Sequence, residues 1–407
     1  MTLCTGAACR THVSERAAFR NGWVWPCASC RAAITPPWSC TMSAITLTGL
    51  ARHLSTTVLF LAALLVAAPA QALSVRCVGT AQELRDALVE VATIPDDVLI
   101  KVRVGNYDAD HADGAFRLTT GQPNQTVTLS GGWIAVLGSC STHLKGSGNT
   151  HLSGSTDAPA LYVSTDTAAG HVVVQDLSLH NPDFAGGGAG SCLSTFTYAG
   201  HQLLIERVTI SQCASAQSGN SANIYNQGGT VVLRNTVIAN NHAAVCAGLG
   251  VATDNNGVTR LAQLSIVGNT GDASTPPAGL YIGTFRSGQT WLDNSLVWGN
   301  VAGADGKDIH LNGSDIHLSR VHYGSLDGSV PADNIAPGTG DPRIVSLTDP
   351  RPRPDSILVD SGAADPQGGA GATDVRGQAR LVGPTLDVGA FELDEAELDV
   401  IFADGFE

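Results

Sequence analysis

The sequence predicts an all-β fold: a parallel β-helix (solenoid) with a short capping helix at its N-terminal end. Strand-like segments recur at spacings of 28 and 31 residues through the middle of the chain, and a repeat of this length indicates a solenoid. Propeller blades need repeats of about 40–50 residues, and the segments lack helical periodicity. Glycine contributes 46 of 407 residues and charged residues only 14%, which favours short strands joined by tight turns.

Residues 1–41 share no pattern with the rest of the chain. They hold five of the ten cysteines and three of the six tryptophans. A single Cys27-x-x-Cys30 with irregular companions is too little to predict a zinc site. We therefore interpret these residues as an extension upstream of the true translation start, Met42.

Residues 42–72 match a secretory signal peptide. Arg52 precedes an apolar run at 58–68, and small residues at Ala70 and Ala72 favour cleavage after Ala72. The run is shorter than the roughly 20 residues of a membrane span, and no later segment is long enough. The sequence thus predicts an exported protein, extracellular or on the outer cell surface, whose mature chain has no transmembrane span.

Residues 73–158 are expected to form the N-terminal cap and the first coils. Thr80 and Glu83 form a capping box at the start of a helix. Three apolar residues then share one face of that helix: Leu84, Leu88 and Val91. The helix would cover a strand edge that otherwise recruits other chains. Two strands are expected to come after it, at 98–104 and 126–129.

Residues 159–347 hold the repeats, each with at least two strands. One series aligns on five apolar residues: Leu179, Ile210, Ile238, Ile266 and Val297. A second series alternates with it, at 160–164, 222–226, 247–251, 278–282 and 307–311. The turn after the first series is rich in asparagine, at Asn181, Asn241, Asn269 and Asn300. Stacked amides can hydrogen-bond along a solenoid axis, so we expect a structural ladder rather than ligand-binding residues.

Five cysteines lie beyond the signal peptide, and export would permit disulfides. Cys77 and Cys140 both lie in the N-terminal region and are one candidate pair. Cys192, Cys213 and Cys246 fall near one kind of turn, so a second pair is expected among them. The odd number leaves at least one thiol without a partner in the chain. Buried reduced cysteines are the alternative.

Segments near both ends carry a resemblance to known proteins. Residues 100–107 and 129–133 resemble the opening coils of exported bacterial right-handed parallel β-helix proteins. Near the other end, 356–362, 374–380 and the closing Leu386-Asp387-Val388-Gly389-Ala390-Phe391-Glu392 are similar to the choice-of-anchor Q domain, which closes with D-x-G-A-x-E. This resemblance implies a right-handed coil, a final coil and cap at 348–392, and a position at or near the cell surface. It implies no reaction.

Four acids of this C-terminal region lie beside glycines: Asp360, Asp374, Asp387 and Glu392. Such carboxylates can accept turn amides or pair with Arg376 and Arg380. Calcium, which favours several oxygen ligands, is the alternative. The last residues, 393–407, form an acidic tail that is either a recognition signal or a frayed terminus.

The sequence offers little for catalysis. Paired carboxylates serve as acid and base in polysaccharide hydrolysis, but the only Asp-Asp pair, Asp96-Asp97, precedes the coils. Gly170-His171 and Gly200-His201 lack the second glycine of the Gly-His-Gly segment in pectin-hydrolase-like enzymes. Residues 290–294 only faintly resemble a segment of pectate-lyase-like enzymes, so we interpret Trp291 and Leu292 as strand residues.

Three histidines lie close together near the end of the repeats: His310, His317 and His322. A metal site could use His310 and His317 with Asp308 or Asp315. Alternation along a strand would place Asp308 and His310 on one face. We expect the polar outside of two strands rather than a metal site.

The sequence therefore favours a secreted or cell-surface β-helix protein without catalytic activity, serving adhesion, binding or envelope structure. Its expected partners are polysaccharides or other cell-surface components, and the net charge of −14 argues against nucleic acid. No cofactor is expected, with calcium as the one candidate ion. The alternative is a polysaccharide lyase or glycoside hydrolase, which rests on fold analogy. Two acids with an Arg, Lys or His in a groove would favour that alternative.

Overall fold

The computed structural model describes residues 72–109, 114–120, 122–165, 170–185, 190–215, 219–244, 246–272, 279–303, 307–329 and 340–394. The expected extension at 1–41, the signal peptide up to residue 71 and the tail beyond residue 394 lie outside the described residues. Pro69–Glu407 form one compact unit, distinct from Met1–Ala68, and all of the described residues belong to it.

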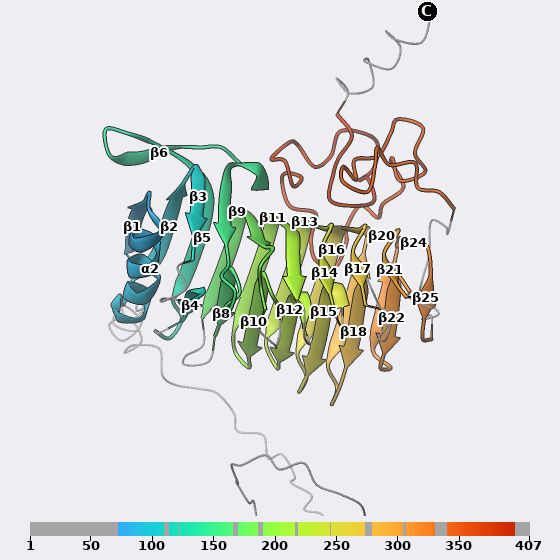
Figure 1. The fold of residues 1–407 in the computed structure, drawn as a ribbon, viewed down its shortest axis with the longest axis horizontal. Coiled ribbons are helices and arrows are strands. Elements are labelled where there is room, and N and C mark those ends of the chain that lie inside the picture. The colour runs from blue at the N-terminus through green and yellow to red at the C-terminus, as the bar shows by residue number, and fades with distance from the viewer. Residues whose placement is uncertain are drawn as a thin grey trace, which may run out of the picture. The chain divides into compact units, whose positions relative to one another are not determined.

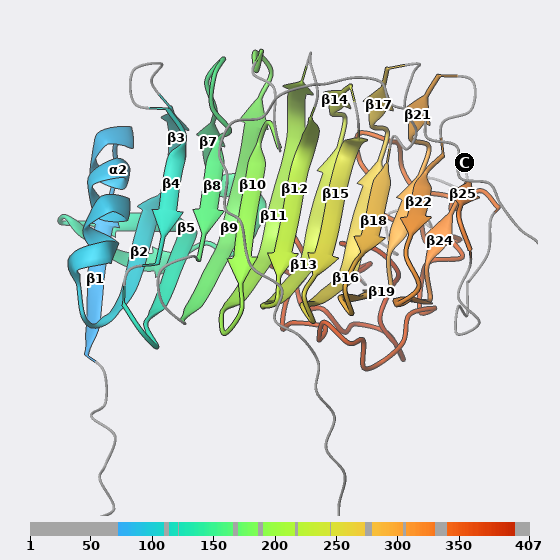
Figure 2. The ribbon, with the colours of Figure 1, turned by 90° about the horizontal axis from the view of Figure 1, so that it is seen from below.

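The unit is a parallel β-solenoid of about seven turns, as the sequence predicted. Figure 1 shows successive coils side by side along the long axis, and Figure 2 shows one of the faces they build. That face is a sheet of eight strands, all parallel, in this order: β4 (Phe116–Thr119), β8 (Leu161–Ser164), β10 (Leu193–Tyr198), β12 (Asn220–Gln227), β15 (Cys246–Asp254), β18 (Leu280–Thr284), β22 (Ile309–Asn312) and β25 (Leu326–Asp327).

The second sheet joins seventeen strands. Nine of them form a continuous parallel series, which we call the long row: β1 (Leu73–Val78), β2 (Asp97–Arg103), β5 (Thr126–Val136), β9 (His171–Asn181), β11 (Gln202–Ser215), β13 (Thr230–Ala239), β16 (Val258–Val267), β19 (Gln289–Asp293) and β23 (Ile316–Ser319). The others are β3 (Gly105–Asp108), β6 (Ser139–His143), β7 (Thr150–Ser153), β14 (His242–Ala243), β17 (Thr270–Gly271), β20 (Leu296–Trp298), β21 (Val301–Ala302) and β24 (His322–Tyr323).

The predicted strand register is confirmed. The five apolar residues used to align the repeats pair in sequence order and are all buried: Leu179, Ile210, Ile238, Ile266 and Val297. The sequence missed β10, whose inward side chains include Thr195 and Thr197. These polar residues weaken the alternation by which a strand is recognised.

A single residue with left-handed backbone bends each of six successive coils, within a strand of the long row or directly after it. These residues share φ values between 46° and 61°: Asp176, Arg207, Asn235, Gln263, Asn294 and Arg320. Asparagine and aspartate tolerate this conformation better than most residues. The bends stack along the solenoid, and two of them, Asn235 and Asn294, hydrogen-bond to the C-terminal segment.

An asparagine ladder runs along the next corner, as predicted for three of four residues. The Nδ2 group of Asn241 donates to Oδ1 of Asn269 (2.9 Å), and that of Asn269 donates to Oδ1 of Asn300 (2.8 Å). The prediction for Asn181 was wrong: its amide donates to three backbone carbonyls of nearby turns instead. Cys213 occupies the ladder position next to it.

The ladder ends on a carboxylate that the sequence did not assign to it. Oδ1 of Asp308 accepts from both the backbone N–H and the Nδ2 group of Asn300, each at 2.8 Å. Its Oδ2 accepts from the backbone N–H of Ser325. Asp308 is also only 4% exposed. Its burial and its hydrogen bonds make it a structural residue.

The N-terminal cap forms as predicted. Helix α2 (Ala81–Glu90) begins after Thr80, whose hydroxyl accepts from the N–H of Glu83, and a 3-10 turn (Val91–Thr93) comes directly after it. The three predicted apolar residues are buried: Leu84, Leu88 and Val91. A second 3-10 turn (Ser147–Asn149) lies beyond the β5–β6 hairpin.

Two disulfides are present: Cys77–Cys140 and Cys192–Cys213. Both pairings fall within the predicted sets. Among the described cysteines, Cys246 is unpaired and fully buried, and burial raises the pKa of its thiol to about 12. This thiol is therefore protonated and shielded, which fits a packing role.

The expected final coil and cap at 348–392 falls within a described segment of the chain, residues 340–394. Within them the structure has isolated bridges but no named strand. The segment folds back along the bends of the long row (Figure 1), where it contacts Ser147 near one end and His322 near the other. Its apolar side chains, which include Leu358 and Val388, form a second apolar cluster together with Val237, Val267 and Leu296 of the coils.

Candidate functional site

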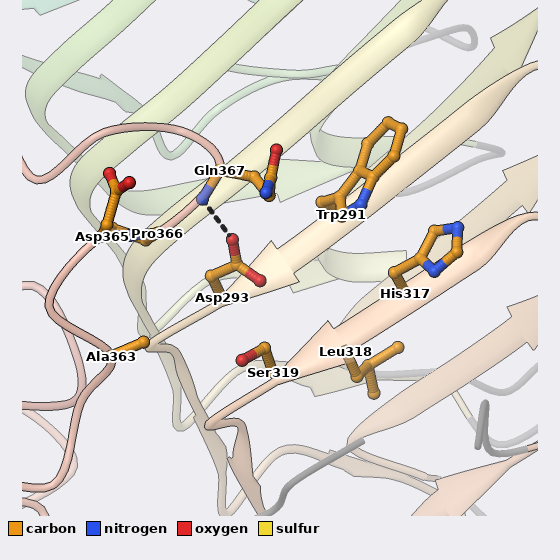
Figure 3. A pocket seen from close by; sticks show the side chains of 9 residues that line it. All are labelled: Trp291, Asp293, His317, Leu318, Ser319, Ala363, Asp365, Pro366 and Gln367. Atoms are coloured by element: carbon orange, nitrogen blue, oxygen red, sulfur yellow. Dashed lines mark hydrogen bonds between the residues drawn. The ribbon is translucent and has the colours of Figure 1, made fainter. Parts of the chain in front are cut away.

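The boundary between the C-terminal segment and the long row holds a cavity of about 260 Å³, which we call the Trp291 pocket. Strands β19 and β23 form its floor, and the segment forms its wall (Figure 3). The lining residues are Trp291, Asp293, His317, Leu318, Ser319, Ala363, Asp365, Pro366 and Gln367. The pocket exists because strand alternation points Trp291 outward while Leu292 enters the core.

The indole ring of Trp291 is held between side chains of the neighbouring coils. The imidazole of His317 stacks on it with ring centroids 5.1 Å apart, and the guanidinium carbon of Arg260 lies 5.6 Å from its centroid. Nε2 of His317 lies 3.0 Å from Oδ1 of Asp315. Both faces of the indole are therefore covered by side chains, so the ring is fixed in position and presents its edge to the pocket.

Asp293 carries the contact between floor and wall. Its carboxylate is 3% exposed and accepts a 2.6 Å hydrogen bond from the backbone N–H of Gln367 (Figure 3). The adjacent bend residue Asn294 holds Ala363 by two further bonds, from its Nδ2 group to the carbonyl and from the Ala363 N–H to its Oδ1. Asp365, by contrast, is exposed.

A second cavity of about 260 Å³, the Leu204 pocket, lies farther along the same boundary. It reaches the segment at Gly368, next to Gln367 of the Trp291 pocket. Its lining is mostly aliphatic: His171, Val172, Val173, Gln202, Leu203, Leu204, Thr230, Val232, Arg234 and Gly368. Outward residues in direct register, Val232, Arg260 and Trp291, connect the two. From β9 to β23 this surface spans roughly 24 Å at the usual strand spacing.

The four C-terminal acids accept turn amides, as predicted. Both oxygens of Asp387 and both of Glu392 accept backbone N–H groups. Asp374 accepts from the N–H of Arg376 and pairs with its guanidinium at 3.0 Å. Among the described residues, no group of three or more His, Cys, Asp or Glu side chains has a metal-binding arrangement.

Burial raises the pKa of Glu392 to about 7, although Arg380 opposes the shift. A carboxyl with a raised pKa contributes stability that is present below pH 4.5 and lost as the pH rises through about 7. We therefore expect the wild-type protein to lose about 2–3 kcal/mol between pH 5 and 8 relative to Glu392→Gln. Urea unfolding at both pH values measures this difference.

The surface glutamate variant Glu90→Gln is the matched control, because the Glu90 side chain is 52% exposed and pairs only with a surface arginine. Its pH slope should equal that of the wild type. An equal slope in Glu392→Gln would show that burial of Glu392 does not govern the pH dependence.

The structure places the two histidines of the alternative metal site on different sheets. His310 lies on β22 of the eight-strand sheet and His317 on β23 of the long row. Asp308 does not share the outer face with His310, because it is buried at the end of the ladder. Burial raises its pKa, and the hydrogen bonds from Asn300 and Ser325 oppose that shift.

Sequence reasoning missed the Trp291 pocket as a site. Trp291 was correctly interpreted as a strand residue, but its partners Asp365 and Gln367 lie more than 70 positions away. These residues come close to Trp291 because of the path of the C-terminal segment, and the sequence of that segment has no periodic pattern. No family model, curated protein or solved structure matches the chain. None of the described helices is long and apolar enough to cross a membrane.

Proposed function

We propose that this is an exported bacterial surface protein that binds an extended polysaccharide without cleaving it. The proposal rests on the two aligned cavities along the boundary between the C-terminal segment and the long row. This arrangement suits a chain-like ligand rather than a compact one. Hydroxyl, amide, imidazole and carboxylate groups beside an indole match the mixed polar and apolar surface of sugars. The signal-peptide pattern and the two disulfides support export.

In this proposal the C-terminal segment keeps the protein at the cell surface. Its resemblance to the choice-of-anchor Q domain supports a position at the cell surface. By packing along the flank, the segment would also build the wall of the binding surface. One element would then link attachment and ligand binding.

A polysaccharide lyase or hydrolase is the second candidate, because two carboxylates and an imidazole do line the Trp291 pocket. Asp293 argues against it: the carboxylate is buried and engaged with the Gln367 amide. A catalytic pair needs both carboxyl groups to reach the substrate. Of the two carboxyl groups that line this pocket, only that of Asp365 is exposed.

We expect wild-type protein to bind a member of a panel of plant, algal and bacterial polysaccharides without releasing reducing ends or unsaturated sugars. Trp291→Ala should weaken that binding by about tenfold or more, because it removes the fixed side chain of the floor. Phe285→Ala is the control, since this exposed aromatic residue lies outside both pockets.

Affinity electrophoresis and product analysis, with calcium and with chelator, measure binding and cleavage together. Cleavage that Asp365→Asn abolishes would establish the enzyme instead. Equal binding by Trp291→Ala and wild type would place the ligand elsewhere.

A further inference from the structure

The β5–β6 hairpin projects from the N-terminal end of the solenoid (Figure 1). Its strands pair in antiparallel fashion from Trp133–His143 to Val136–Ser139, and the Cys77–Cys140 disulfide ties it to β1. Large apolar side chains of the hairpin and its base are exposed: Ile134 (38%), Val136 (56%), Leu137 (103%) and Leu144 (40%). An exposed cluster of this kind on a fixed projection marks an interaction surface.

Leu137, at the tip of the hairpin, is unfavourable for the backbone conformation of the turn. Leu137 and Gly138 form a two-residue turn with φ values of 52° and 82°. Asparagine followed by glycine is the preferred pair for such a turn, and leucine is disfavoured at positive φ. Leu137 is also fully exposed, so it gains nothing from burial in the chain. Folding of the chain alone gives no reason for a leucine at this position.

The charge around the hairpin differs from that of the chain. Residues 114–156 contain no Asp or Glu, although the chain has 36 acids. Two of the three lysines in the whole chain adjoin the hairpin: Lys101 at its base and Lys145 after β6. Nζ of Lys101 lies 3.8 Å from the ring centroid of Trp133. An apolar tip above a tryptophan and lysines is the arrangement of side chains found at membrane interfaces.

We propose that this hairpin inserts its tip into the surface of an anionic lipid bilayer. Val136 and Leu137 would enter the acyl boundary, while the exposed Lys145 meets the negative headgroups. Lys101, whose Nζ donates to the carbonyl of Cys140 at 3.0 Å, adds positive charge at the base of the hairpin. A protein pocket could accept the same apolar tip, but the local excess of lysines in an acidic chain favours a negatively charged surface. This surface is distinct from the Trp291 pocket, so the inference does not rest on polysaccharide binding.

Vesicle flotation tests the proposal with the chain that follows the predicted signal peptide, residues 73–407. We expect flotation with vesicles of phosphatidylcholine and phosphatidylglycerol (about 3:1 by design) that weakens with added salt, and much less with phosphatidylcholine alone. Leu137→Asn should weaken partitioning by about tenfold, and Val136→Thr/Leu137→Asn further. Leu381→Asn, at a leucine 60% exposed in the C-terminal segment, should have no effect.

The Leu137→Asn variant also separates a defect in membrane binding from a defect in folding. Asparagine suits the left-handed turn, so Leu137→Asn should unfold at the same temperature as the wild type or a higher one. Weaker flotation with unchanged unfolding supports insertion. Absence of wild-type flotation, or equal flotation of Leu137→Asn and wild type, overturns the proposal.

Discussion

Replacing Asp176 with asparagine is expected to lower the free energy of unfolding by about 4 kcal/mol, because it removes the main counter-charge of a buried arginine. Asp176 is completely buried, and its two oxygens accept from Nε and an Nη of Arg207 at 2.7 and 3.1 Å. The backbone N–H of Gly146 donates to the same carboxylate at 2.7 Å. The asparagine would present a donor where these donors converge.

The effect should depend on pH in a defined direction. Burial alone would raise the pKa of Asp176, but hydrogen bonds from His143 and Arg207 outweigh it and hold the pKa below its ordinary value. Stability from a lowered carboxyl pKa is present above the unfolded pKa and is lost as the pH falls through the folded pKa. The gap between wild type and Asp176→Asn should therefore be full at pH 7 and shrink well below pH 4.

Urea unfolding at pH 7 and at low pH measures this effect. Asp355→Asn is the matched control, because Asp355 pairs with Arg343 at the surface and both side chains are more than half exposed. That change should cost under about 1 kcal/mol. If the Asp176 and Asp355 variants lost equal stability, the buried pair of Asp176 and Arg207 would contribute no more than a surface ion pair.

Replacing Asn269 with alanine is expected to cost about 4 kcal/mol as well. Its side chain is completely buried and makes four hydrogen bonds, two as acceptor from Asn241 and two as donor to Asn300 and the carbonyl of Ile238. Alanine would remove the acceptor of the Asn241 backbone N–H and the side-chain donor to the carbonyl of Ile238, while Asn300 and the Asn241 amide would each keep one other partner. Each buried polar group left without a partner costs about 1–3 kcal/mol before relaxation, and the lost side chain also leaves a cavity.

Asn312→Ala provides the comparison for the ladder. Asn312 is exposed, and its amide donates to the hydroxyl of Tyr281 at the surface. Its loss should change the free energy of unfolding by less than about 1 kcal/mol. A similarly small loss for Asn269→Ala would mean that water replaces the ladder amides, and that stacking of the coils does not depend on them.

Local patterns were sufficient to predict the coils. The alignment on Leu179 and Ile210 reproduces the observed register because a strand that slips by one residue turns its apolar side chains to solvent. The capping helix was predicted from Thr80 and Glu83 for a similar reason, since both groups act within one turn. Where inward residues were polar, as in β10, the same reasoning missed a strand.

The sequence by itself determined the solenoid, the N-terminal cap, most of the ladder and the sets of cysteines that pair. Each of these rests on neighbours in sequence or on a regular repeat. Only the tertiary structure decided the path of residues 340–394, and with it the Trp291 pocket and the engagement of Asp293 by Gln367. That path is held by single side chains of stacked bends, such as Asn294, whose partners obey no period. Non-periodic contacts between distant residues leave no local pattern in the sequence, because their free energy appears only when the coils have already formed.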